Sequence, residues 1–349
     1  MASVTVLVTG VGGGGFGEQI FKALRLASTE YNIVVGDMAP KAKPFVEADH
    51  AYVLPPAGDP VYIETILEIC KKHSAVAVFS GSEPELKVMS AGRVELEHQG
   101  IFLPINPTSV LNICLDKVKT FDFLTANGFD APCYRRVSSA EDAQSISKFP
   151  VVLKPSVGSG GSANVFLAQT PSELACLSQY FLSLYPEFIV QEYVGTPEAE
   201  YTVGVLLGMD GELLNSIAVK RNILTSLSNR IKVANRTGRS ELGHVLALSN
   251  GISQGEIGRF PEVTGPCEHI AQVLGCRSAV NIQCRFVDGR VHVFEINPRF
   301  SGTTSLRAMV GYNEPDVLIR KHVFGEFIRP RFSYASGTIT RSLTETLFS

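Results

Sequence analysis

Two polar segments near position 290 carry the residue types that bind metal ions. Asn-Ile-Gln at 281–283 and Glu-Ile-Asn at 295–297 flank an Asp-Gly dipeptide, which is a hairpin turn signal. Because side chains alternate along a strand, Gln283, Glu295 and Asn297 can point to one face of two antiparallel strands. Their amide and carboxylate oxygens suit Mg²⁺, a hard cation that prefers oxygen ligands. The spacing therefore predicts a magnesium site on this hairpin.

Cationic and glycine-rich residues supply candidates for phosphate binding. Arg299 follows the metal motif and offers a planar fork for a phosphoryl or carboxylate oxygen. Lys154 ends an apolar strand at 150–154, and the N–H groups of the small-residue loop that follows could approach phosphate oxygens. The loop candidates are Ser159, Gly160, Gly161 and Ser162. Since no Lys-Ser or Lys-Thr closes the loop, it is not a Walker A motif, and an idle surface hairpin would have the same composition.

The glycine-rich run at 10–17 lies between a predicted strand and a predicted helix. Gly13 and its neighbours would let the backbone approach an anion at a helix N-terminus. Asp37 ends the second strand, roughly where dinucleotide folds place a ribose-binding acid. A tight turn that closes the first strand–helix unit explains the glycines at least as well. Glu83 and Glu85 follow the third strand, where open α/β sheets bind ligands, so they are candidates to face a substrate amine.

Two further segments have both a functional and a structural interpretation. The strand predicted at 188–194 can offer backbone groups to a purine edge, with Glu200 as a nearby acceptor for ribose hydroxyls, but an ordinary amphipathic strand has the same pattern. The polar stretch 226–241 contains Arg236 among four basic residues, and it is predicted to be a mobile loop that closes over an anionic substrate. A solvated basic loop explains this stretch equally well.

The elements that would position these residues fall into three groups. The first third alternates strands with helices, which predicts a parallel sheet covered on both faces, with segments at 4–8, 19–26, 32–37, 62–70 and 75–79. A small α+β lobe is predicted next, with segments at 115–126, 150–154, 164–168 and 171–184. Longer strands then predict an antiparallel sheet, with segments at 188–194, 200–209, 214–221, 279–286 and 291–297 and a helix at 265–274.

Composition is typical of a folded cytoplasmic protein. The 349 residues suggest two or three packed units, and a content of 45% hydrophobic and 19% charged residues excludes a disordered chain. The net charge of −3 argues against binding to nucleic acid or to an anionic membrane. Seven cysteines without a CxxC pair indicate reduced thiols, and we expect neither a signal peptide nor a membrane span.

The segments from about 106 to 326 resemble the ATP-grasp superfamily, in the branch of the carbamoyl-phosphate synthetase large subunit. The resemblance is carried by the order of Lys154, the Gly-rich loop, Gln191-Glu192 and the paired motif that ends in Arg299. It implies two lobes that clamp ATP between antiparallel sheets. It also implies Mg²⁺ as the metal, with Mn²⁺ as a substitute.

The resemblance implies a role for each matching residue. The phosphates and the adenine side would be contacted by Lys117 and Lys154, and the metal would be bound by Gln283, Glu295 and Asn297. Adenine would be surrounded by Glu192, Tyr193 and Val194, and ribose would be held by Glu200. The transferring phosphoryl group or the substrate would face Arg299, Lys220 and Arg221. Further substrate candidates are Gly13, Glu83, Glu85, Arg236 and Arg307.

The expected architecture is α/β and α+β. It comprises a Rossmann-like domain at 1–110, a small ATP-grasp lobe at 111–187, a large lobe with the metal site at 188–330, and a tail or strand at 331–349. The implied reaction activates a carboxylate as an acyl phosphate and joins it to an amine, releasing ADP and phosphate. One alternative is a carbamoyl- or carboxyl-phosphate-forming synthetase, and another is an NAD(P)-dependent oxidoreductase that uses the N-terminal glycines. We expect small-molecule substrates and, by default, a homodimer.

Overall fold

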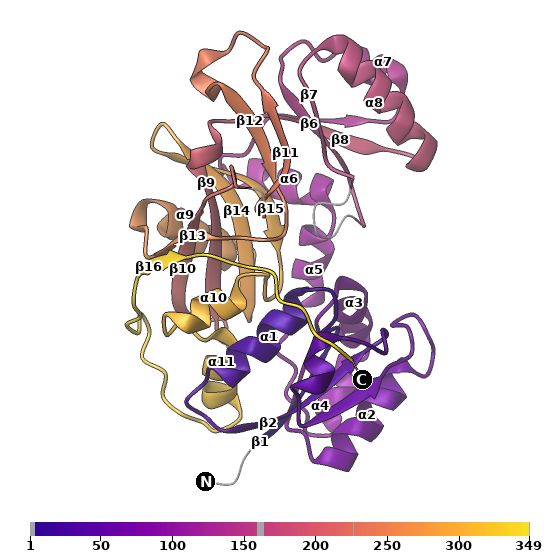
Figure 1. Cartoon of the computed structure of the whole chain (residues 1–349), viewed down its shortest axis with the longest axis vertical. Helices are drawn as coiled ribbons and strands as arrows, with labels where there is room; N and C mark the ends of the chain where they lie inside the picture. Colours follow the sequence, from indigo (N-terminus) through magenta and orange to yellow (C-terminus); the bar gives the residue numbers. More distant parts are fainter. Residues whose placement is uncertain (1–3, 159–163, 226, 349) are drawn as a thin grey trace.

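Four sheets organise the chain, which the computed structural model describes at residues 4–158, 164–225 and 227–348 (Figure 1). They are a parallel N-terminal sheet, a small antiparallel sheet, a large antiparallel sheet and a two-stranded hairpin. Figure 1 shows the N-terminal unit at the bottom, the large sheet in the middle and the small sheet at the top. The predicted combination of a parallel α/β unit with antiparallel α+β lobes is confirmed.

The N-terminal unit is a parallel sheet in the order β3-β2-β1-β4. Its strands are β1 (Val4–Thr9), β2 (Tyr31–Asp37), β3 (His50–Val53) and β4 (Ala77–Phe79). Its helices are α1 (Phe16–Arg25), α2 (Tyr62–His73), α3 (Glu83–Ala91), α4 (Arg93–His98) and α5 (Thr108–Cys114). In β1, Val6 and Val8 enter one core and Leu7 enters another, which is why three consecutive residues in the middle of the strand are apolar.

The small lobe is built on a sheet in the order β5-β8-β6-β7. Its elements are α6 (Lys117–Ala126), β5 (Tyr134–Val137), α7 (Ala140–Gln144), β6 (Val151–Pro155), β7 (Phe166–Ala168), α8 (Pro171–Leu184) and β8 (Phe188–Glu192). Strand β8 pairs with both β5 and β6, so the small sheet continues past the lobe boundary predicted between 187 and 188. The sequence pattern identified this strand, but apolar alternation does not tell which sheet a strand joins.

The large lobe is built on an antiparallel sheet in the order β15-β14-β9-β10-β13-β16. The strands are β9 (Glu200–Leu207), β10 (Leu213–Arg221), β13 (Gly255–Gly258), β14 (Ala279–Val287), β15 (Arg290–Asn297) and β16 (Gly337–Ile339), and the helices are α9 (Pro261–Val273), α10 (Thr304–Met309) and α11 (Glu314–His322). Asp288 and Gly289 join β14 to β15 with φ values of 50° and 77°. Positive φ at both central residues is what a type I′ hairpin turn requires, so this predicted turn is confirmed.

The hairpin of β11 (Asn229–Ala234) and β12 (Val245–Ser249) joins the two lobes. Leu246 and Leu248 of β12 pack with Val152 of β6 and with Tyr193. Part of the stretch 226–241 is therefore a paired strand, and the prediction of a loop throughout that stretch is wrong. Short 3₁₀ turns occupy Lys43–Val46, Pro197–Ala199 and Ser240–Leu242.

The C-terminal segment ties the large lobe to the N-terminal unit. After β16 the chain runs across α1 toward the N-terminal sheet (Figure 1), where Lys43 Nζ donates to Thr344 Oγ1 at 2.8 Å. Helices α10 and α11 pack against α1, and Tyr31 Oη donates to Asp316 Oδ1 at 2.8 Å. One continuous apolar core joins the two units at this contact.

None of the helices in the described ranges combines the length and the apolar character that crossing a membrane requires. All seven cysteines lie within those ranges and are free thiols.

Candidate functional site

A pocket between the small sheet and the large sheet, here called the interlobe pocket, collects many of the predicted nucleotide-binding residues. The small lobe contributes Lys117, Pro132, Val152, Lys154, Val165, Gln191 and Glu192, and the segment that follows contributes Tyr193 and Val194. The large lobe and the hairpin contribute Glu200, Leu248, Ser249, Gln283, Arg285, His292, Phe294 and Glu295. The lining combines apolar side chains with charged ones, which suits a ligand with a flat ring system and an anionic tail.

A second pocket, here called the polar pocket, adjoins the first. It is lined by Thr202, Arg221, Asn250, Gly251, Ser253, Asn281, Gln283, Glu295, Asn297, Arg299, Ser301, Gly302 and Thr303. Gln283 and Glu295 line both pockets, so they stand at the junction between them.

The three predicted metal ligands share the face of the sheet that carries the polar pocket. Gln283 is paired directly with Glu295 across β14 and β15, and Asn297 lies two residues further along. Gln283 Nε2 donates to Glu295 Oε2 at 2.6 Å, and Asn297 Oδ1 accepts from Arg299 Nη2 at 3.1 Å. The predicted convergence of these oxygen-bearing side chains on one cleft is therefore present.

This donor set fits a divalent cation that is shared with an anionic ligand. Among the described residues there is no group of three or more His, Cys, Asp and Glu side chains arranged to hold a metal by themselves. The site instead offers one carboxylate and two amides. Mg²⁺ is commonly bound through one or two carboxylates together with phosphate oxygens of the substrate, which is the arrangement that Glu295 and its neighbours permit.

Lys154 lies buried inside the interlobe pocket. Its Nζ donates to the Phe294 carbonyl at 2.8 Å and lies 5.1 Å from the centre of the Phe121 ring. Burial, followed by the nearby positive charge of Lys117, lowers the pKa of Lys154 to about 7, although Glu295 acts in the opposite direction. The ammonium is thus held in a place where an incoming anion would restore its charge.

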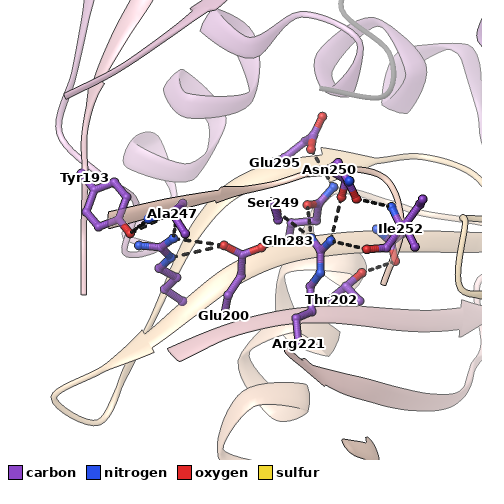
Figure 2. Close-up of polar contacts among 12 residues, drawn as sticks. Tyr193, Glu200, Thr202, Arg221, Ala247, Ser249, Asn250, Ile252, Gln283 and Glu295 are labelled. Atoms are coloured by element: carbon purple, nitrogen blue, oxygen red, sulfur yellow. Dashed lines mark hydrogen bonds and ion pairs between the residues drawn. The ribbon is translucent and has the colours of Figure 1, made fainter. Parts of the chain in front are cut away.

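A buried cluster of ion pairs lies among the residues that line the two pockets. Glu200 accepts from Arg221 at 3.0 Å and from Arg285 at 3.2 Å (Figure 2). Arg221 also donates to Ser249, to the carbonyls of Asn250 and Ile252, and to Gln283 at 3.5 Å.

Two predicted roles change because of this cluster. Both carboxylate oxygens of Glu200 accept from arginines, so Glu200 holds the two guanidinium groups together instead of offering a free acid to ribose. Arg221 is only 3% exposed and is surrounded by protein acceptors, so it positions Gln283 and the loop at 249–252 and does not face the substrate as a free cation. Burial lowers the pKa of Arg221.

Lys220 lies on the face of the sheet opposite to the pockets, so the structure does not bring it to the position that its predicted catalytic role requires. It is paired with Tyr201 in β9, which in turn is paired with Cys284 in β14. Directly paired residues point to the same side of a sheet, and Tyr201 and Cys284 belong to the core that α9 covers. Arg221, the next residue, is the one that faces the pockets.

Arg299 connects the polar pocket to the N-terminal unit. Its Nη2 lies 3.2 Å from Glu83 Oε1, and its guanidinium stacks 4.3 Å from the centre of the Phe16 ring. Its Nη1 donates to the Phe300 carbonyl at 3.0 Å, while Nε is buried without a hydrogen-bond partner in the described part of the chain. Glu83 therefore acts on the pocket only indirectly, because its carboxylate pairs with the guanidinium of Arg299.

None of the five predicted substrate residues lines either pocket, although Glu83 contacts Arg299, which does. Glu85 is buried, accepts from Tyr62 at 2.9 Å and from Ser82 at 2.8 Å, and has a pKa raised by burial. Gly13 lies on an exposed turn at 12–15.

The other two are arginines with protein partners of their own. Arg236 is exposed and pairs with Glu173 of α8. Arg307 is 1% exposed and pairs with Glu314 at 3.0 Å, so the large lobe buries it as a structural ion pair. The structure does not bring Glu85, Arg236 or Arg307 to either pocket, and each side chain already has protein partners.

The segment 191–194 lines the interlobe pocket with all four of its residues. Glu192 pairs with Lys148 at 2.5 Å, and Tyr193 Oη bonds both the N–H and the carbonyl of Ala247, which fastens β12 to the small lobe (Figure 2). Gln191 Oε1 is buried and finds no donor among the described residues. The predicted loop residues Ser159, Gly160, Gly161 and Ser162 lie outside the described residues.

Some pocket residues had no motif to identify them. Arg285 was detectable in principle, because it lies two residues after Gln283 on the same strand and so shares its face. Val152 has the same relation to Lys154. By contrast, Leu248 and Ser249 come from a hairpin whose position depends on packing against the small lobe, which no local pattern indicates.

Comparison with known proteins places this geometry in a family. Residues 6–104 match the PylC-like N-terminal domain, and residues 114–303 match the ATP-grasp domain. The carbamoyl phosphate synthase large chain of Thermoplasma acidophilum is 26% identical over 276 residues, which cover 74% of this chain and 24% of that protein. The matched segment thus spans about a quarter of the length of such relatives.

Solved structures share the fold at low identity. The L-amino acid ligase of Bacillus licheniformis superposes with a TM-score of 0.64 at 16% identity, covering 94% of this chain and 78% of that one. The biotin carboxylase domain of 2-oxoglutarate carboxylase from Hydrogenobacter thermophilus, solved with MgADP, ADP and bicarbonate, gives 0.61 at 17% identity, covering 94% and 71%. Since the ATP-grasp match covers more than half of the residues and the two pockets meet at its paired strands, the chain belongs to the ATP-grasp family.

Proposed function

We propose that this protein is an ATP- and Mg²⁺-dependent ligase that activates a carboxylate as an acyl phosphate and joins it to an amine, releasing ADP and phosphate. The observation that carries the proposal is the position of Gln283 and Glu295, which line both pockets. An anionic tail that extends from the interlobe pocket would end at these residues, where it would meet an acid held in the polar pocket. The ligase activity of the fold neighbour supports the same reaction class.

The interlobe pocket is the proposed nucleotide site. Lys154 and Lys117 would contact the phosphates, and the segment 191–194 would border the adenine, where the buried Gln191 oxygen is ready to accept from an amino group. The loop at 159–162 remains a proposed phosphate contact from its composition.

The paired strands are the proposed metal site. Glu295 and Asn297, with Gln283, would hold Mg²⁺ or Mn²⁺. When bound, the ion would neutralise charge on the phosphate oxygens. Glu295 and Asn297 already face the pocket, so these side chains need only exchange their present partners for the cation.

The reaction needs positioned charges more than a nucleophilic side chain. A carboxylate oxygen of the acid forms a bond to the γ-phosphorus while the bond from that phosphorus to the β–γ bridging oxygen breaks and ADP departs. The amine nitrogen then bonds to the acyl carbon, phosphate departs and the nitrogen loses a proton. Arg299 would neutralise the oxygens of the transferring group, and Lys154 would hold the nucleotide in line.

An ADP-release assay tests the proposal. A panel of small acids is offered with and without a panel of amines in the presence of ATP and Mg²⁺. The proposal expects ADP and phosphate in equal amounts, with formation that depends on both an acid and an amine. Formation of AMP and pyrophosphate would refute it.

A carbamoyl- or carboxyl-phosphate-forming synthetase is the second candidate. It is favoured by the relatives named carbamoyl phosphate synthase large chain, although the match spans about a quarter of their length. A phosphorylated product that accumulates without any added amine would distinguish this synthetase from a ligase.

A dinucleotide-dependent oxidoreductase has less structural support. Asp37 accepts from the Gly12 and Ala39 amides at 2.6 and 2.7 Å, so the acid already stabilises its own turn. Titration with NAD(P)H tests this alternative, because binding would perturb the reduced-nicotinamide fluorescence.

We further propose that the protein acts in the cytoplasm on small-molecule substrates, as a homodimer.

A further inference from the structure

The walls of the polar pocket contain no apolar side chain. Its lining residues are glycines or carry hydroxyl, amide, carboxylate or guanidinium groups. A substrate with an apolar body would gain no hydrophobic burial there and would leave these groups without partners. A pocket of this kind selects a small acid whose remaining atoms are also polar.

Arg341 is unusual among the arginines of the described chain. Every other arginine that is shielded from solvent has a carboxylate within 4 Å, and these are Arg93, Arg221, Arg239, Arg285, Arg299, Arg307 and Arg320. Arg341 has only neutral acceptors, since its Nη2 donates to Gln19 Oε1 at 3.3 Å and to the Gly302 carbonyl. Its Nε is buried and has no hydrogen-bond partner in the described ranges.

No carboxylate of the described residues forms an ion pair with Arg341. Glu18 acts on Arg341 through its charge, but it pairs with Lys22 at 2.5 Å. A buried guanidinium without an anion is costly, and a bidentate carboxylate offsets much of that cost. The positive charge of Arg341 is therefore not balanced by a paired carboxylate.

Arg341 lies directly behind the wall of the polar pocket. Its backbone N–H donates to Gln254 Oε1 at 3.2 Å, and its guanidinium bonds the carbonyl of Gly302, a residue of that wall. Gly251 borders the same place, where a Cβ built on Gly302 would lie 3.0 Å from the Gly251 carbonyl. Two glycines thus leave only backbone between the pocket and the positive charge.

We propose that the acid substrate is a small polar dianion and that Arg341 recognises its second, non-reacting anionic group. This inference rests on the proposed ligase function and narrows its substrate class to acids such as dicarboxylates. The reacting carboxylate lies near Arg299 and Glu295, and the other carboxylate lies against the backbone of Gly251 and Gly302, with the positive charge of Arg341 behind it. Arg341 is then a specificity-determining residue.

The test compares matched acids on the wild type and on R341Q. Glutamate and aspartate are set against glutamine and asparagine, which have the same size but lack the second charge, and leucine serves as the apolar acid. We expect ADP release with kcat/KM at least about tenfold higher for the diacid than for its amide, because a second negative charge is attracted to a guanidinium that only backbone separates from the pocket. R341Q should remove this preference through KM, and R341K should restore part of it.

A second measurement does not need turnover. Calorimetric titration of glutamate into the protein loaded with MgADP should show binding to the wild type and at least tenfold weaker binding to R341Q. The control variant Thr344→Ala removes the other anchor of the tail, at Lys43, and should leave the diacid preference unchanged.

The outcomes separate this inference from the proposed function. Equal losses for diacid and amide in R341Q would mean that Arg341 only anchors the tail, and a preference for leucine would mean that the pocket has been misassigned; either overturns the inference and leaves the ligase standing. Failure of every acid to support ADP release, together with no glutamate binding, would overturn both.

Discussion

Nucleotide binding should depend on pH through Lys154. The ammonium is buried at the centre of the interlobe pocket and its pKa is about 7. The protonated form binds phosphate, and the phosphate charge raises the pKa of the bound lysine. The affinity for the nucleotide is therefore highest below pH 7. It falls as the pH rises above 7, and it levels off once the pH exceeds the pKa of Lys154 in the complex.

The size of the effect follows from the fraction of Lys154 that carries a proton. With a pKa of about 7, the free lysine is roughly nine-tenths protonated at pH 6 and one-tenth protonated at pH 8. Affinity for an ATP analogue with excess Mg²⁺ should thus fall about tenfold between these pH values. Binding should take up about half a proton at pH 7 and about 0.9 proton at pH 8.

Calorimetry in buffers of different ionisation enthalpy measures the proton uptake directly. Lys154→Arg keeps the charge without titrating in this range, so its uptake should be close to zero. Lys148→Met removes an exposed cation that pairs with Glu192 of the pocket lining, and it should keep the wild-type uptake. His292→Gln controls for the histidine in the lining. Wild-type uptake near zero at pH 8, or unchanged uptake in Lys154→Arg, would refute the reasoning.

Three further predictions concern carboxylates and their partners. Glu295→Gln should lower kcat roughly 10²–10³-fold, because a metal ligand at the transferring phosphate is worth several kcal/mol; near-normal turnover at saturating Mg²⁺, with the circular dichroism spectrum unchanged, would contradict this. Glu83→Ala should lower kcat/KM about tenfold by removing the charged partner of Arg299, and Glu83→Gln should retain most of it; equal steady-state ADP release in all three proteins would argue against any positioning by Glu83. Arg307→Met should reduce the free energy of unfolding by about 3–5 kcal/mol, because Glu314 is left buried and unpaired; chemical denaturation measures this, and a loss below about 1 kcal/mol would show that the pair is not a structural one.

The hairpin of β14 and β15 could be predicted because its sequence signals all lie within one short segment. Strand alternation and an Asp-Gly turn are enough to place Gln283 opposite Glu295, and the structure has this register. Lys154 could be predicted from the same kind of pattern, because it lies at the end of an apolar strand, and the structure places it in the lining of the pocket.

Which residues of β10 face the pockets could not be predicted in this way. Lys220 and Arg221 are adjacent basic residues, and only the pairing with Tyr201 shows which of them faces the pockets. A shift of one residue in register exchanges the two faces of a strand, so composition alone leaves the choice open.

Long-range charge pairing was equally hidden. Glu200 looked like a free acid, yet Arg221 and Arg285 from two other strands neutralise it, and Arg307 finds Glu314 one helix away. Such pairs are decided by the packing of whole elements, whereas a sequence motif reports only the spacing of residues within one element.

The central claim is that β14 and β15 hold a divalent ion against the triphosphate of a bound nucleotide. A crystal structure of the protein with Mn²⁺ and a non-hydrolysable ATP analogue tests it most directly, because the anomalous signal of manganese locates the ion. The account predicts a peak within bonding distance of Glu295, Asn297 and the terminal phosphate oxygens. A peak remote from these side chains, or a nucleotide whose phosphates leave the interlobe pocket in another direction, would contradict it.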